Sequence, residues 1–222
     1  MTLYLDTAEV SAWANLMPTG LFHGITTNPL LAARAGLDYP AINWSDMAAR
    51  ARELGAKELH AQVYGPADGY VDWAGNLYEM GKAVGIESVV KIPLVEEAIR
   101  VTPKIKELGG RILMTACYDA KQMFVAQALG ADFIAPYFGR MMEAGIDGET
   151  HLATMTAMNR AAAKPCKVLV ASLRSAKQMI TLANLGHAHF TIAPAIAEDL
   201  MTSSHSREAF DAFEDAILSA AK

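Results

Sequence analysis

The sequence predicts a (β/α)8 barrel, and its repeating pattern and its length both indicate this fold. Short apolar segments alternate with helical segments eight times, which is the pattern of a parallel α/β fold. The chain has 222 residues, which suits one barrel of this class, typically about 250 residues long. An open doubly wound sheet is the competing architecture, but eight strands without a glycine-rich nucleotide fingerprint fit it less well. No linker or block of charge divides the chain, so we expect a single domain over residues 1–222.

Each expected strand is a short apolar run that ends in polar or turn-forming residues. The first run ends in Asp6 and Thr7, and either residue can cap the helix that follows. The second run ends at Pro29, which is well suited to begin a helix. In chain order, the expected strands cover residues 3–7, 24–29, 59–64, 88–94, 111–115, 132–137, 167–172 and 189–194.

The expected helices fill the intervals between these strands and extend beyond the last one. The long interval after the second strand predicts two helices, with an interruption around residues 36–40. We expect residues 138–147 to form a loop. The expected helices cover residues 8–16, 30–54 with that interruption, 67–81, 95–108, 120–129, 148–163, 175–185, 195–201 and 207–221.

Composition excludes several classes of partner. The formal net charge of −5 argues against a nucleic acid or an anionic membrane as a partner. No apolar run is long enough to span a membrane and nothing resembles a secretory signal, so we expect a cytoplasmic protein. The two cysteines, Cys117 and Cys166, lie far apart without metal-ligand spacing, and we expect neither a metal ion nor a cofactor. His60, in the third strand, is more simply a packing or hydrogen-bonding residue than a ligand.

One lysine, Lys91, stands in the middle of the fourth expected strand. The adjacent Val89 and Val90 and the other apolar neighbours predict that this strand is buried. A charged amine in such a strand costs several kcal/mol unless it is paired or loses its proton. Desolvation lowers the pKa of a lysine and leaves a nucleophile that can condense with a carbonyl group. The simpler alternative is a lysine at the end of a strand that extends its ammonium group to water.

Polar residues follow nearly every expected strand. In a barrel of this class, catalytic groups lie at the carboxyl ends of the strands. Strands one to seven each place at least one polar side chain there, whereas strand eight contributes little beyond Thr191. These polar residues are Asp6, Thr26, Asn28, Gln62, Lys91, Thr115, Tyr137, Arg140, Ser172 and Arg174. A ring of polar groups around a central lysine suits amine-based carbonyl chemistry.

Donor and acceptor capacity suggests a catalytic role for four of these residues. Lys91 can form a carbinolamine and then an iminium ion with a ketone, and the iminium withdraws electrons from the adjacent bonds. Tyr137 can move protons on and off the substrate oxygen. It can do so directly or through a water molecule held by Gln62 and Thr115.

Asp6 is a further catalytic candidate, and the remaining polar residues, Thr26 among them, suit substrate binding. Asp6 and Asn28 can bind substrate hydroxyl groups, and Asp6 can also steer the protonation of Lys91 or accept a proton itself. Arg140 and the pair Ser172 and Arg174 follow strands six and seven, where barrels often bind phosphate. The alternative for the two arginines is an ordinary pair of surface ion pairs.

Five collinear segments resemble the small transaldolase and fructose-6-phosphate aldolase family. They cover residues 3–7, 24–29, 89–93, 135–137 with Arg140, and 171–174. The resemblance implies a class I aldolase barrel in which Lys91 forms the Schiff base. It further implies a dihydroxyacetone unit as donor and an aldehyde sugar as acceptor, so that sugar phosphates or related ketones and aldehydes are the expected substrates.

Two positions separate the subtypes of this family. Transaldolases carry Glu on the third strand and commonly Phe on the sixth, whereas the aldolase subtype carries Gln and Tyr. Gln62 and Tyr137 resemble the aldolase subtype, as does the segment around Thr115. Arg174 and the pair Gly139-Arg140 resemble the transaldolase subtype, and the segment 37–59 matches the family poorly.

Three functional hypotheses follow from these features. The leading one is a class I aldolase that cleaves or forms fructose 6-phosphate or a related ketose, with dihydroxyacetone and glyceraldehyde 3-phosphate as the cleavage products. The alternative is a transaldolase that moves a dihydroxyacetone unit between sugar phosphates or sulfo-sugars. The third is a catalytically silent barrel that binds sugar phosphates.

The last expected helix, residues 207–221, carries an apolar stripe. Its apolar residues recur at helical spacing at Ala209, Phe210, Phe213, Ala216, Ile217 and Ala220. Such a helix can lie on its own barrel. The family resemblance instead implies that it grips a neighbouring subunit, and we expect a homo-oligomer, either a pentamer or a decamer.

Overall fold

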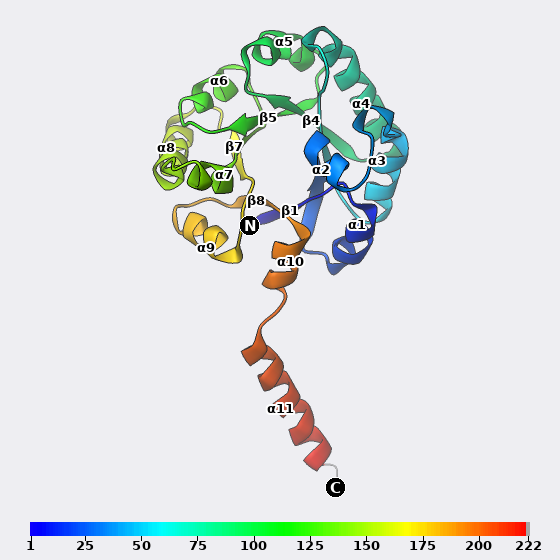
Figure 1. Cartoon of the computed structure of the whole chain (residues 1–222), viewed down its shortest axis with the longest axis vertical. Coiled ribbons are helices and arrows are strands. Elements are labelled where there is room, and N and C mark those ends of the chain that lie inside the picture. Colours follow the sequence, from blue (N-terminus) through cyan, green and yellow to red (C-terminus); the bar gives the residue numbers. More distant parts are fainter. Residues whose placement is uncertain (221–222) are drawn as a thin grey trace.

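The computed structural model describes residues 1–220 and forms a closed barrel of eight parallel strands with helices around it (Figure 1). Each strand pairs with the next along the chain, and the eighth pairs with the first, which closes the barrel. The strands are β1 (Thr2–Asp6), β2 (Phe22–Thr26), β3 (Glu58–Gln62), β4 (Glu87–Pro93), β5 (Arg111–Cys117), β6 (Phe133–Pro136), β7 (Lys167–Val170) and β8 (His189–Ile192). The predicted (β/α)8 fold is therefore confirmed.

Helices connect the strands and cover the outside of the barrel, except for the last helix, which extends away from it. They are α1 (Val10–Leu16), α2 (Pro29–Arg34), α3 (Trp44–Glu53), α4 (Tyr70–Val84), α5 (Glu96–Glu107), α6 (Gln122–Ala128), α7 (Phe138–Glu143), α8 (Gly148–Ala161), α9 (Ala176–Asn184), α10 (Pro194–Leu200) and α11 (Ser204–Ala220). Single 3-10 turns lie at η1 (Met17–Thr19), η2 (Tyr39–Ala41) and η3 (Ala67–Gly69). Helix α5 illustrates the packing, because Ala98, Thr102 and Ile105 are buried at helical spacing against the barrel.

The alternation of side chains along each strand gives the barrel two apolar layers. One face of each strand packs on the surrounding helices, and the other fills the barrel interior. In β4, Val90 and Ile92 belong to the outer layer, whereas Val89 belongs to the inner cluster. Lys91 alternates with Val90 and Ile92, so its side chain also points into the barrel.

Several boundaries differ from the expectation by a few residues; α4, for example, spans Tyr70–Val84 rather than residues 67–81. Helix α1 begins at Val10 rather than Ala8, because the Thr7 hydroxyl accepts a hydrogen bond of 3.1 Å from the Glu9 amide just before the helix. The interruption between α2 and α3 spans residues 35–43 and contains the turn η2. Helix α11 begins at Ser204, three residues before the expected start, and Ala221 lies outside the described residues.

The expected loop over residues 138–147 is wrong at its start, where α7 forms a short helix. Gly139 permits this helix, because its amide donates a hydrogen bond of 3.0 Å to the Ser172 carbonyl and a Cβ atom there would clash with that oxygen. A contact between two separate loops therefore determines the helix, and neither loop reveals it alone.

Helix α11 extends away from the barrel in Figure 1. All of its described side chains from Ser204 to Ser219 are exposed. Among residues 1–220, no helix is long and apolar enough to cross a membrane.

Candidate active site

One cavity of about 640 Å³ opens at the carboxyl ends of the strands, within the size range of small-molecule sites. All ten polar residues expected from the sequence line it, namely Asp6, Thr26, Asn28, Gln62, Lys91, Thr115, Tyr137, Arg140, Ser172 and Arg174. Thr191 from β8 also lines the cavity. The polar residues expected at seven separate strand ends thus meet in one place.

Lys91 lies at the floor of this cavity and is only 5% exposed. Its Nζ donates a hydrogen bond of 2.7 Å to the backbone carbonyl of Thr27. Burial lowers the pKa of Lys91, and the negative charge of Asp6 partly opposes that shift. The side chain does not reach bulk water, so the simple alternative of an extended surface ammonium does not hold. A buried amine with a lowered pKa is suited to nucleophilic attack on a carbonyl group.

Asp6 is held at the end of β1 by a pair of threonines. The Thr26 hydroxyl donates a hydrogen bond of 2.6 Å to Asp6 Oδ1. The hydroxyl of Thr191 lies 2.5 Å from that of Thr26, which links β8 to the same group. One carboxylate oxygen is therefore oriented by the protein.

Tyr137 stands at the end of β6 among groups that fix its ring. Its hydroxyl lies 2.9 Å from the Thr115 hydroxyl, so either oxygen can donate to the other. The Tyr118 ring packs edge-on against it at 5.7 Å, and the Arg140 guanidinium lies 5.1 Å from the ring centroid. Burial raises the pKa of Tyr137, although its bond to Thr115 opposes the shift. At neutral pH the phenol keeps its proton and can donate it.

Asn28 and Gln62 differ in whether their side chains already form hydrogen bonds within the protein. Asn28 Oδ1 caps helix α2 by accepting a hydrogen bond of 3.0 Å from the Leu31 amide, as expected for an Asn-Pro helix start. Its amide nitrogen is the part left for a ligand. The side-chain amide of Gln62 makes no hydrogen bond with any residue in the range 1–220, and the residue is half-buried.

Two residues on the cavity wall have left-handed backbone conformations. Ala116 has φ of 57° and Ser172 has φ of 61°, which is uncommon for residues other than glycine. Both line the cavity, Ala116 near the carboxyl end of β5 and Ser172 just after β7. Such conformations concentrate at functional sites, where the surrounding structure holds them.

The two arginines expected to bind an anion have different surroundings. Arg174 forms a two-pronged ion pair with Glu143, at 2.7 Å and 3.2 Å, and its Nη1 lies 3.2 Å from Ser172 Oγ. Arg140 lies against Tyr137 and makes no ion pair within residues 1–220. Arg140 is therefore the more available of the two cations, and Arg174 must share its charge with a carboxylate.

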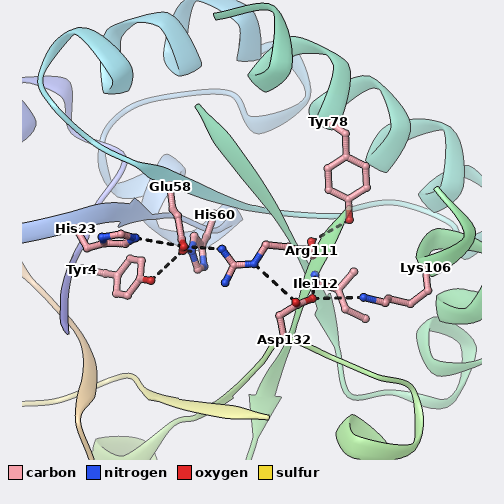
Figure 2. Close-up of polar contacts among 9 residues, drawn as sticks. All are labelled: Tyr4, His23, Glu58, His60, Tyr78, Lys106, Arg111, Ile112 and Asp132. Atoms are coloured by element: carbon pink, nitrogen blue, oxygen red, sulfur yellow. Dashed lines mark hydrogen bonds and ion pairs between the residues drawn. The ribbon is translucent and has the colours of Figure 1, made fainter. Parts of the chain in front are cut away.

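A second polar cluster lies at the opposite, amino-terminal end of the barrel and does not line the cavity (Figure 2). Glu58 accepts hydrogen bonds from Tyr4 at 2.8 Å and Arg111 at 2.6 Å. His60 lies 2.8 Å from the same carboxylate, and His23 lies 3.3 Å from it. His60 is thus a hydrogen-bonding residue, in agreement with its expected role.

The protonation of this second cluster follows from its contacts. Burial alone would raise the pKa of Glu58, but its hydrogen bonds with His60 and Arg111 and the charge of Arg111 hold it well below its usual range. Burial lowers the pKa of His60 to about 4, against the opposing effect of Glu58. The pair at neutral pH is therefore an ionised carboxylate and a neutral imidazole. Nowhere in residues 1–220 do three or more His, Cys, Asp or Glu side chains gather as a possible metal site.

Several residues of the cavity were not expected from the sequence. Arg34, at the end of α2, lines the mouth, and its position one helix after β2 was the only available signal. The carbonyl of Thr27 binds Lys91, and the backbone of Ala116 adopts its unusual conformation, without any side-chain signature. The contributions of Thr27 and Ala116 are made by the backbone, which explains why residue types did not reveal them.

Comparisons with known proteins agree with the geometry. A family model described as Transaldolase/Fructose-6-phosphate aldolase matches residues 3–222. A probable transaldolase from Ruegeria pomeroyi is 28% identical over 218 residues, which cover 96% of this chain and 94% of that protein. A probable transaldolase from Anaeromyxobacter dehalogenans is 30% identical over 206 residues, which cover 90% and 88% of the two chains.

Solved structures show similarity of the fold alone. Mandelate oxidase with (S)-2-phenylpropionate superposes with a TM-score of 0.61 and 13% identity, over 89% of this chain and 66% of that one. A structure described as native KDPGal superposes with a TM-score of 0.55 and 15% identity, over 86% of this chain and 81% of that one. Identities this low support the barrel architecture and no statement about substrate.

Proposed function

Because this chain belongs to the transaldolase/fructose-6-phosphate aldolase family, we propose that it transfers a dihydroxyacetone unit from a ketose to an aldehyde sugar through a Schiff base on Lys91. The sequence alone favoured the aldolase reaction, in which the same unit is released rather than transferred. The relatives that cover nearly the whole chain are named probable transaldolases, and this favours transfer.

The observation that carries the proposal is the position of Lys91. Its amine is buried at the floor of a cavity ringed by neutral and acidic proton carriers, and burial lowers its pKa. A neutral amine can attack the ketone carbon of a ketose, while a proton passes from nitrogen to oxygen. Tyr137 then donates a proton to the hydroxyl that leaves as water, and a cationic imine remains on Lys91.

Carbon–carbon bond cleavage follows from the charge of this imine. Asp6, with one oxygen fixed by Thr26, accepts the proton of the substrate hydroxyl at C4. The bond between C3 and C4 breaks, C4 becomes the carbon of a released aldehyde, and the electron pair moves into the imine to form an enamine. In transfer, C3 of this enamine attacks the aldehyde carbon of a second sugar, whose oxygen takes up a proton. Water then attacks the imine carbon of the product, and the new ketose leaves Lys91.

Aldol cleavage is the second candidate, and the neutral amide of Gln62 is the observation that favours it. In cleavage, C3 of the enamine takes a proton, water attacks the imine carbon, and dihydroxyacetone leaves Lys91. An amide holds a water molecule without acting as a base, and the Tyr137–Thr115 pair can supply the protons. The two candidates share every step up to the enamine.

We assign the anionic end of the substrate to Arg140, with Arg174 and Ser172 beside it. Arg140 is free of ion pairs within residues 1–220, whereas Arg174 must exchange or share Glu143. A guanidinium fork matches the oxygens of a phosphate or sulfonate group. Sugar phosphates are the substrates consistent with the family.

We also propose that α11 packs against another copy of this chain. The exposed fractions of Phe213, Ile217 and Leu218 are 67%, 65% and 66%, and these residues share a helix that leaves its own barrel. Burial of these side chains in an oligomer would remove that apolar surface from water. Light scattering at micromolar concentration should give a mass several times that of one chain, and a monomer would contradict this assignment.

The fate of the enamine separates the two reactions. Fructose 6-phosphate is supplied first without an acceptor and then with erythrose 4-phosphate, and released glyceraldehyde 3-phosphate is measured in both. Transfer predicts at most one equivalent of aldehyde per Lys91 without the acceptor, and continued turnover when the acceptor is present. Continued release of aldehyde and dihydroxyacetone without the acceptor would establish the aldolase reaction instead.

A further inference from the structure

The backbone of Gln62 is bound by a tyrosine side chain from outside the sheet. The Tyr39 hydroxyl donates a hydrogen bond of 2.7 Å to the Gln62 carbonyl and accepts one of 2.8 Å from the Gln62 amide. One hydroxyl oxygen thus forms hydrogen bonds with both the backbone amide and the backbone carbonyl of Gln62. Tyr39 belongs to the turn η2, in the connection between α2 and α3, and does not line the cavity.

The strand pairing explains why Gln62 needs this contact. The ladder between β2 and β3 ends where Thr26 pairs with His60, and the last bond runs from the Thr27 amide to the His60 carbonyl. Beyond that point the chain leaves β2 at Asn28 to begin α2. The backbone amide and carbonyl of Gln62 point to the same side as those of His60, toward β2. Because β2 has already ended there, these two groups have no strand partner. The Tyr39 hydroxyl occupies the place of the missing backbone.

The Tyr39 ring is itself held firmly. It is 5% exposed and packs edge-on against Trp44 at 5.2 Å and against Tyr64 at 5.5 Å. Trp73 packs against both of these neighbours and completes a small aromatic cluster. Burial raises the pKa of Tyr39, so its hydroxyl keeps the proton that it donates.

We propose that Tyr39 is a positioning residue, which fixes the backbone of Gln62 and thereby directs the Gln62 amide at the reacting group on Lys91. This inference rests on the proposed function, in which Gln62 holds the water that serves proton transfer. The strand register places Gln62 directly opposite Lys91 on β4, so a shift of this backbone moves the amide relative to the imine. Tyr39 should therefore influence the chemical step and the division between transfer and hydrolysis, and should leave the anion-binding end unaffected.

Tyr39→Phe tests this role, and Tyr78→Phe is the matched control. Tyr78 also donates a buried hydrogen bond to a strand carbonyl, at 2.9 Å to Arg111, but at the opposite end of the barrel. We expect Tyr39→Phe to lower kcat by about 10- to 100-fold with the KM for fructose 6-phosphate within about twofold. We expect Tyr78→Phe to leave both constants unchanged. Equal kcat values for the two variants would overturn the proposal.

A double-mutant cycle with Gln62→Ala separates positioning from a general loss of stability. If Tyr39 acts through Gln62, Tyr39→Phe should reduce kcat by less than about twofold in a protein that already carries Gln62→Ala. Full additivity of the two losses would show that Tyr39 does not act through Gln62.

Amide hydrogen exchange tests the contact without any substrate. The peptide that contains Gln62 and Val63 should exchange faster in Tyr39→Phe than in the unmodified protein, and should be unchanged in Tyr78→Phe. Unchanged exchange in Tyr39→Phe would contradict the positioning role even if the protein is active. Faster exchange in a protein that lacks all ketose activity would instead retain the backbone role and reject the proposed function.

Discussion

The two ends of the barrel each place a carboxylate near a cation, but the contacts of these charges differ. At the amino-terminal end, Glu58 receives four polar contacts, and Arg111 is bonded directly to it (Figure 2). At the carboxyl end, Asp6 receives one hydrogen bond from Thr26, and Lys91 is bonded to a carbonyl rather than to a carboxylate. Glu58 and Arg111 are thus paired with each other, whereas Asp6 and Lys91 keep hydrogen-bonding groups that are available to a ligand.

The protonation of the two cations reflects this contrast. Burial alone would lower the pKa of Arg111, but Glu58 and Asp132 raise it above its usual value. Burial also lowers the pKa of Lys91, and the more distant charge of Asp6 only partly opposes the shift. The same fold therefore stabilises the charged form of the guanidinium at one end and favours loss of the proton from the amine at the other. Changes at the carboxyl end should affect catalysis, and changes at the amino-terminal end should affect stability.

Replacement of Lys91 should have the largest effect. We expect Lys91→Met to lower kcat by at least about 1,000-fold, because no imine can form. The thermal midpoint should stay the same or rise, since a buried amine is replaced by an apolar side chain of similar length. Steady-state kinetics and thermal unfolding measure both effects, with Lys82→Met on the exposed face of α4 as the control. Retention of activity would contradict the mechanism.

Removal of the Tyr137 hydroxyl should come next. We expect Tyr137→Phe to lower kcat by about 100-fold, because the proton carrier next to Thr115 is lost while the ring contacts remain. The KM for the ketose should change little. A large rise in KM with an unchanged kcat would assign Tyr137 to binding instead of proton transfer.

At the amino-terminal end, Glu58→Gln should destabilise the fold rather than abolish catalysis. The change removes the carboxylate that Tyr4, His60 and Arg111 share and leaves Arg111 with Asp132 alone, which costs about 3 kcal/mol for a largely buried pair. Denaturant unfolding measures this loss. At temperatures where the variant is folded, kcat should stay within about threefold of the unmodified protein. A loss of kcat comparable to that of Tyr137→Phe, without a loss of stability, would remove the contrast between the two ends.

Arg140 should show a smaller effect, confined to binding. We expect Arg140→Gln to raise the KM for a phosphorylated ketose by about tenfold, because a charge-assisted fork to the anion is lost. An unphosphorylated ketose or hydroxyketone should be much less affected. Equal effects on charged and uncharged substrates would mean that Arg140 does not bind the anionic end.

The acid limb of kcat/KM should show the smallest change, a shift of its midpoint that is separate from the loss of rate when Asp6→Asn removes the base for the C4 hydroxyl. Protonated Lys91 cannot attack a carbonyl, so activity should fall on the acid side, with a midpoint below the ordinary lysine pKa of 10.5. The charge of Asp6 raises the pKa of Lys91, so Asp6→Asn should move this midpoint to lower pH. A midpoint that moves to higher pH would contradict the assignment of the acid limb to Lys91.

The sequence revealed the carboxyl end of the barrel better than the amino-terminal end. An apolar run with a polar residue such as Asp6, Lys91 or Tyr137 toward its carboxyl end is a recognisable sequence pattern. A parallel barrel necessarily brings such strand ends together. The residues of the cluster around Glu58 form no such sequence pattern, because they come from the starts of four strands and meet only through the register of the closed sheet.

Two other features that the sequence did not predict also depend on contacts between distant parts of the chain. Helix α7 depends on Gly139 approaching the Ser172 carbonyl, and the Gln62 backbone depends on a tyrosine 23 residues away. Both are contacts between a backbone and a distant loop, and residue patterns carry little information on such contacts.

Borohydride trapping tests the central claim most directly. The protein is incubated with fructose 6-phosphate, reduced with borohydride, digested and mapped by mass spectrometry. The account predicts a reduced three-carbon adduct on the peptide that contains Lys91. The absence of any adduct, or an adduct on another lysine with Lys91 unmodified, would show that the buried amine does not form the imine.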